Sequence, residues 1–144
     1  MATTYLRSAF LMASLLTFAA VSSHAQSPQV KKEPIQMTSA ASGSEMFNSY
    51  CASCHGKDAK GNGPAAASLK VPPADLTQLA KKNSGKFPTD HVANELRSGV
   101  AGAHGSPEMP VWGPLFSAVS GRDDAMVQMR IANVVHYLES LQAK

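Results

Sequence analysis

Apolar residues recur at helical spacing near the middle of the chain's first half. Met46, Phe47 and Tyr50 lie three and four residues apart, which gives a helix one apolar face. Ser44 is the predicted N-cap, because a serine hydroxyl can accept a hydrogen bond from an unpaired N–H group of the first turn. The pattern therefore predicts a helix that begins near Ser44 and runs into Cys51.

A middle helix is predicted after residue 88. Val92 and Leu96 lie four residues apart, as on one face of a helix. Thr89 is the predicted N-cap, and Gly99 stands just past the last apolar position, where glycine commonly ends a helix.

The last helix has the most regular pattern. Ser120, with Asp123 three residues later, resembles a capping box at its start. Its apolar face is formed by residues at helical spacing: Val127, Ile131, Val134, Val135, Leu138 and Leu141. Glycines and prolines predict long loops at 56–73 and 100–114, and no segment alternates as a strand. The sequence therefore predicts an all-α fold of about three main helices joined by long loops.

The N-terminal residues indicate export. Arg7 precedes an apolar run of about 13 residues, which is shorter than the roughly 20 residues that a membrane span needs. Small residues at Ser23 and Ala25 then follow in the pattern of a cleavage site. We predict a signal peptide at 1–25, cleaved after about Ala25, and a periplasmic location. An anchor that is not cleaved is the alternative.

Composition and charge narrow the class of protein. Residues 26–42 are polar and without period, which predicts a flexible leader before a domain at 43–144. Only 6% of the residues are aromatic, and two cysteines cannot form a disulfide framework. The formal charge is +3, without the interleaved aromatic residues or the motifs of nucleic-acid binding. Such a domain needs another source of apolar core volume.

The run Cys51-Ala52-Ser53-Cys54-His55 has the spacing of c-type haem attachment. Two thiols three residues apart on a helical turn can reach both vinyl groups of one porphyrin, and the next residue places an imidazole under the iron. A redox dithiol would need a βαβ context, and a zinc site would need a second ligand pair. We therefore predict one haem c, bound covalently through Cys51 and Cys54 and ligated by His55. The macrocycle would supply the missing apolar volume.

With this motif, the sequence resembles the class I c-type cytochromes over about 100 residues, the size of one domain. The resemblance implies the cytochrome c fold, in which Gly43 and Phe47 pack against an aromatic residue of the last helix, here Tyr137. The loop that ends at Pro64 resembles the family loop whose proline carbonyl accepts a hydrogen bond from the haem-binding histidine. Pro64 would then orient His55.

The resemblance also implies a distal methionine ligand in a late loop. Met109 lies between two prolines, Pro107 and Pro110, which stiffen the backbone that presents its thioether. His104, in the same loop, is the alternative ligand. The resemblance implies that Trp112 packs on the haem or donates a hydrogen bond from its indole N–H group to a haem propionate. The alternative is that Trp112 only fills the core.

A His55 and Met109 pair fills both axial positions and leaves no vacancy for oxygen or peroxide. The predicted function is one-electron transfer, not catalysis, between a dehydrogenase or bc1-like donor and a terminal oxidase or reductase. The alternatives are a haem peroxidase or gas-binding protein with an open distal site, and the haem subunit of a larger oxidoreductase. Residues 57–86 carry six lysines against two aspartates, which either steer an acidic partner or form a solvated face.

Overall fold

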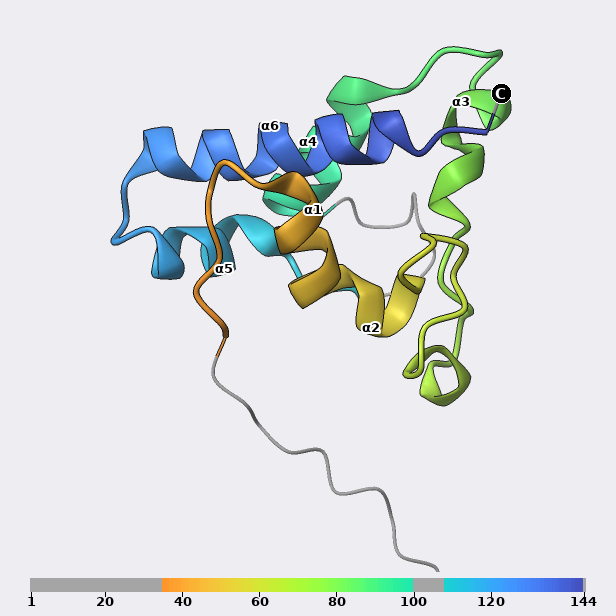
Figure 1. Ribbon diagram of the computed structural model, residues 1–144, viewed down its shortest axis with the longest axis horizontal. Coiled ribbons are helices and arrows are strands. Elements are labelled where there is room, and N and C mark those ends of the chain that lie inside the picture. The colour runs from red at the N-terminus through yellow and green to blue at the C-terminus, as the bar shows by residue number, and fades with distance from the viewer. Residues whose placement is uncertain (1–34, 100–107, 144) are drawn as a thin grey trace, which may run out of the picture. The chain divides into compact units, whose positions relative to one another are not determined.

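The computed structural model describes residues 35–99 and 108–143, and this part of the chain is helical (Figure 1). The predicted signal peptide at 1–25 lies outside it. The elements in chain order are α1 Gly43–Met46, η1 Phe47–Cys51, α2 Ala52–His55, η2 Ala66–Ser68, η3 Leu76–Gln78, α3 Leu79–Lys82, α4 Thr89–Ser98, α5 Trp112–Val119 and α6 Asp124–Ser140. No strand forms among the described residues, so the predicted all-α fold is confirmed. None of the described helices has the length and apolar character of a membrane span.

The elements α1, η1 and α2 follow one another without a break and form the first predicted helix. It begins two residues earlier than expected, because Ser42 rather than Ser44 caps it. The Ser42 hydroxyl accepts a hydrogen bond from the Glu45 N–H group at 3.2 Å. Met46 and Phe47 are fully buried, which confirms the predicted apolar face.

The contact between α1 and α6 requires a glycine. A Cβ atom on Gly43 would lie 2.0 Å from the carbonyl oxygen of Asn133 and 3.0 Å from Cβ of Tyr137. The ring centroids of Phe47 and Tyr137 are 5.4 Å apart. The structure therefore confirms the packing of Gly43 and Phe47 on Tyr137 that the resemblance implies.

Helix α6 contacts α1, α4 and α5 (Figure 1). Its N-cap is Asp123, whose side chain accepts hydrogen bonds from the N–H groups of Ala125 and Met126. The predicted capping box is wrong in its cap residue, because the Ser120 hydroxyl instead accepts a hydrogen bond from Arg130. The apolar face is buried as predicted at Val127, Ile131, Val134, Val135 and Leu138. Leu141, the last predicted position, follows the end of the helix and is half-buried.

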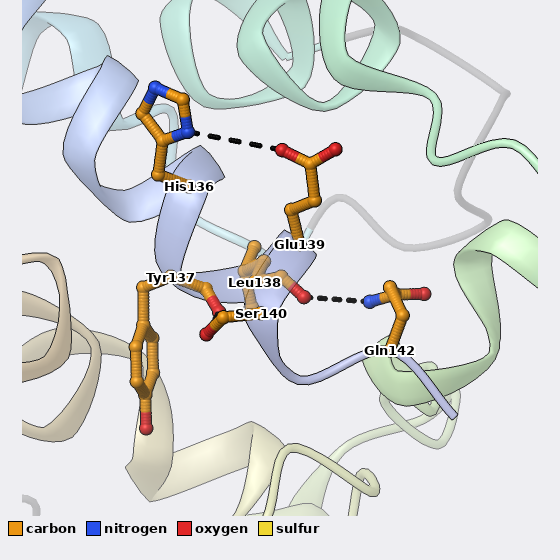
Figure 2. Close-up of polar contacts among 6 residues, drawn as sticks. All are labelled: His136, Tyr137, Leu138, Glu139, Ser140 and Gln142. Atoms are coloured by element: carbon orange, nitrogen blue, oxygen red, sulfur yellow. Dashed lines mark hydrogen bonds and ion pairs between the residues drawn. The ribbon is translucent and has the colours of Figure 1, made fainter. Parts of the chain in front are cut away.

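The residues after α6 tie the C-terminal turn to η3. Gln142 Nε2 donates to the Leu138 carbonyl at 2.7 Å (Figure 2) and to the Leu76 carbonyl at 2.8 Å. On the exposed side of the same helix, His136 Nδ1 lies 3.8 Å from Glu139 Oε2 (Figure 2). Because Gln142 bridges two elements that are distant in sequence, it fixes η3 against α6.

Helix α4 lies where the pattern predicts it, although Thr89 is its first residue and Pro88 holds the cap position. Gly99 follows its last residue with a φ of +61°, which is typical of a glycine that ends a helix. Val92 and Leu96 are buried, as their spacing predicts.

The predicted end of the loop at 100–114 is wrong, because helix α5 already begins at Trp112. A Cβ atom on Gly113 would lie 2.2 Å from the Arg97 carbonyl oxygen, so the glycine lets α5 lie directly against the end of α4. Pro114 stands in the first turn, where its missing N–H group costs no helical hydrogen bond. Glycine and proline, which predict a loop, here permit a tightly packed helix.

The last residues of the predicted flexible leader pack on the domain. Thr38 is buried, and its Oγ1 atom lies 2.8 Å from the Tyr50 hydroxyl and accepts a hydrogen bond from Arg130 at 3.1 Å. The Asn133 amide donates to the Ala40 carbonyl at 2.8 Å. These contacts show that Thr38 and Ala40, which precede the predicted boundary at residue 43, pack on the domain.

Candidate functional site

The attachment motif lies at the end of the first helix. Cys51 is the last residue of η1, and Cys54 and His55 belong to α2. The turn before them has π-helical bonding, in which the Ala52 N–H group donates to the Phe47 carbonyl. Such π turns occur frequently at functional sites. All three motif residues line one cavity.

This cavity is mainly apolar and open to solvent. Its volume is about 120 Å³, and about 1020 Å³ when the space at its open mouth is included. Apolar residues from α4, α6, η3, α3 and the preceding loop form much of its wall, among them Leu69, Leu76, Leu79, Val92, Leu96 and Val134. Two carboxylate residues, Glu95 and Glu108, also line it. An open apolar cavity beside two thiols and an imidazole suits a flat macrocycle.

His55 has a defined orientation. Its Nδ1 atom lies 3.1 Å from the Ala74 carbonyl oxygen, which can only accept, so Nδ1 carries the proton. Burial lowers the pKa of His55, and the hydrogen bond to Ala74 opposes this shift in part. The imidazole is therefore neutral at neutral pH, with Nε2 as the nitrogen that can bind a metal.

The structure corrects the role predicted for Pro64. Pro64 is exposed and does not line the cavity, and the Ala74 carbonyl takes the place expected of its carbonyl. The cause is the loop's close return to α2, where the Gly63 N–H group donates to the Cys54 carbonyl at 3.0 Å. A Cβ atom on Gly63 would lie 2.4 Å from the Ser53 carbonyl oxygen. Pro64 therefore follows a segment that is held against α2, and the Ala74 carbonyl rather than the Pro64 carbonyl pairs with the His55 imidazole.

Met109 lies at the cavity, and 37% of its surface is exposed. No other methionine of the described residues lines this cavity. Met46 instead lies in the core, where its sulfur accepts a hydrogen bond from Arg130 at 3.6 Å. His104, the alternative ligand, lies outside the described residues.

Trp112 is buried in the cavity wall. Its ring stacks on that of Tyr50, with centroids 5.6 Å apart and 27° between the planes. Phe116 lies next to both, at 5.7 Å from Trp112 and 6.0 Å from Tyr50. The sequence pattern predicts Tyr50 only as part of a helix face, although its position one residue before Cys51 is a usable signal for the site. Together these rings form an aromatic wall beside the motif.

The cysteines do not resemble a reactive dithiol. Burial, with a smaller contribution from nearby Cys54, raises the pKa of the Cys51 thiol to about 12. A redox-active pair instead needs a thiol whose pKa is lowered. Among the described residues, no three His, Cys, Asp or Glu side chains come together as a metal site. The donor set, two thiols, an imidazole and a thioether around an apolar cavity, fits a c-type haem.

A known protein family matches the part of the chain that forms the cavity. No curated protein and no solved structure gives a significant match. The model of the family described as cytochrome c oxidase, cbb3-type, subunit III matches residues 38–138, and the class I subtype stays a prediction. That match begins at Thr38, the buried leader residue, and includes the whole cavity wall. Because it covers most of the chain, the protein belongs to this family of c-type cytochromes, whose implied cofactor is haem c.

Proposed function

We propose that the protein is a one-electron carrier with a single haem c. Thioether bonds from Cys51 and Cys54 would hold the haem, and His55 and Met109 would ligate its iron. One observation carries the proposal: these four side chains, from segments more than 50 residues apart, line the same apolar cavity. Bound haem would supply an iron centre that changes between ferric and ferrous states.

The chain's own residues would hold that centre and keep water from it. The Ala74 carbonyl fixes the proton of His55 on Nδ1, which leaves Nε2 for the iron. The apolar wall would favour the less charged, ferrous form of a bound haem, because a charged centre is costly to bury. Met109 would fill the distal position and deny it to oxygen, peroxide and cyanide. Trp112, stacked on Tyr50, would close the cavity from the side of α5.

The test is a spectrum of the oxidised and reduced protein, purified from a host that matures such cytochromes. We expect a c-type pyridine haemochrome, a mass increase of one haem, and a sulfur-to-iron band at about 695 nm in the ferric form. A ferric protein without that band, which binds cyanide at once, would instead have the open distal site of a peroxidase or gas-binding protein. A protein of bare apoprotein mass would overturn the proposal.

The partners that we propose are membrane redox complexes. The family description names a subunit of a cbb3-type oxidase, and this supports an oxidase as electron acceptor, with a bc1-like complex or dehydrogenase as donor. The cluster of lysines at 57–86 is exposed and would face an acidic partner: Lys57, Lys60, Lys70, Lys81, Lys82 and Lys86. Electron transfer to a purified oxidase should then slow as ionic strength rises. An independence of rate from salt would contradict this docking mode.

We further propose that the chain acts in the periplasm after loss of residues 1–25. The support is the sequence pattern of a basic residue, a short apolar run and a small-residue cleavage site. N-terminal sequencing of the exported protein should begin at Gln26. An intact N-terminus on membrane-bound protein would show that the run remains as an anchor.

A further inference from the structure

Residues 70–74, here called the bridging segment, contact both sides of the cavity. At one end, the Ala74 carbonyl lies 3.1 Å from His55 Nδ1. At the other end, the Lys70 N–H group donates to the Glu108 carboxylate, at 3.1 Å from Oε2 and 3.3 Å from Oε1. Glu108 directly precedes Met109. The segment therefore joins the histidine to the backbone that carries the methionine.

The bridging segment has few conformations available to it. Pro72 and Pro73 stand at its centre and fix two successive φ angles. The residues on either side, Leu69 and Asp75, are both extended. The chain bends at residues 69–71, and the two prolines then restrict the rest of the segment, so a shift at Ala74 would be transmitted towards Lys70.

The Ala74 end is anchored by the neighbouring loop. The Leu76 N–H group donates to the Ala59 carbonyl at 2.8 Å. Asp75 accepts hydrogen bonds from the Thr77 N–H group at 2.9 Å and from its hydroxyl at 2.6 Å. A Cβ atom on Gly61 would lie 2.3 Å from the Pro73 carbonyl oxygen, so the two loops touch through their backbones. Because the Ala74 end is fixed in this way, Lys70 at the other end has a defined position against which Glu108 and Met109 can be held.

We infer that Glu108 is a positioning residue, which uses the bridging segment to hold Met109 at the distal face of the haem. The inference rests on the proposed ligation by Met109. Glu108 does not touch the iron. By bonding to Lys70 it restricts the backbone that presents the thioether, and it thereby slows dissociation of the methionine. The binding of an external ligand to the ferric protein reports that dissociation, since cyanide can bind only when the distal position is free.

The first experiment measures cyanide association and the band at about 695 nm in ferric holoprotein variants. Glu108→Ala removes the acceptor and should speed cyanide association about two- to tenfold, the range expected for loss of one hydrogen bond. Glu108→Gln keeps an acceptor oxygen and should remain close to the wild type. Asp90→Ala removes an exposed carboxylate from outside the cavity wall and serves as the matched control.

The second experiment changes the donor and leaves Glu108 intact. Lys70→Pro removes the N–H group, and the extended conformation of Leu69 is one that a residue before proline adopts. Lys70→Ala removes the amine but keeps the N–H group. Cyanide association should be faster in Lys70→Pro and unchanged in Lys70→Ala. This pair decides the question if Glu108→Ala does not mature.

The outcomes separate this inference from the function on which it rests. If the wild type has the sulfur-to-iron band, and neither Glu108→Ala nor Lys70→Pro changes cyanide association, the positioning role is refuted and ligation by Met109 stands. If Glu108→Gln behaves as Glu108→Ala does, charge rather than the hydrogen bond is responsible, and the inference also fails. If the wild type lacks the band, the proposed ligation fails and this role falls with it.

Discussion

Truncation of Phe47 tests the packing that holds the first and last helices together. Its side chain is 0% exposed, contacts the Tyr137 ring at 5.4 Å and forms part of the cavity wall. Replacing a buried Phe by Ala removes its transfer free energy and leaves a void, at a cost of about 3 to 5 kcal/mol. Loss of the aromatic pair contributes to this cost, at about 0.5 to 1.5 kcal/mol. A domain of ordinary stability has about 5 to 15 kcal/mol in all, so Phe47→Ala should be close to unfolding.

The measurement is guanidinium unfolding of the holoprotein, followed by far-UV circular dichroism, with the haem attached in both states. Phe47→Leu keeps an apolar side chain of intermediate volume and should lose less stability than Phe47→Ala. Met37→Ala is the surface control: Met37 is 72% exposed, and its truncation should cost less than about 0.5 kcal/mol. A loss below about 1 kcal/mol for Phe47→Ala, with an unchanged denaturant slope, would refute the packing argument.

Three further changes test other parts of the structure. Gly43→Ala should destabilise the domain by at least about 1 to 3 kcal/mol in the same unfolding assay, because the added Cβ would lie 2.0 Å from the Asn133 carbonyl oxygen; wild-type stability would contradict the close contact. Met109→Ala should remove the band at about 695 nm and lower the reduction potential measured by voltammetry, whereas an unchanged spectrum would identify another ligand. Hydrogen bonds from Thr77 hold the pKa of Asp75 below its usual value. The charged Asp75 side chain therefore stabilises the fold at a pH above the usual aspartate pKa, and this contribution is lost as the pH falls through the lowered pKa. The stability difference between the wild type and Asp75→Asn should therefore be present at about pH 6 and shrink as the pH falls below the usual pKa of an aspartate, and a difference that does not change with pH would contradict it.

Local patterns in the sequence are sufficient to predict the first helix, α4 and α6, and the position of the attachment motif at the end of the first helix. The period of the last helix identifies its buried face, because that face contacts other helices along most of its length. The attachment motif depends only on the spacing of Cys51, Cys54 and His55, and one helical segment determines that spacing. Gly43 and Tyr137 were identified through the family resemblance, since their contact joins distant parts of the chain.

The sequence could not identify the carbonyl that orients His55. That choice depends on how two loops pack, and here the Gly61 and Gly63 backbones approach their neighbours more closely than any Cβ would allow. A backbone carbonyl has no residue-specific signal, so Ala74 could not be distinguished from Pro64 by its side chain. Helix α5 was missed for a related reason. Gly113 and Pro114 lower helix propensity, but packing against α4 and α6 outweighs that cost.

The packing of residues that precede the predicted boundary at 43 is explained by a buried cation rather than by an apolar pattern. Arg130 is only 4% exposed, and its three hydrogen bonds go to the Ser120 hydroxyl at 3.0 Å, the Thr38 hydroxyl at 3.1 Å and the Met46 sulfur at 3.6 Å. A buried guanidinium needs acceptors, because its water is lost on folding. One of these acceptors lies in the segment before residue 43, so that segment must pack for Arg130 to be satisfied. Polar, aperiodic residues look like a flexible leader in sequence, yet here they complete the surroundings of a buried charge.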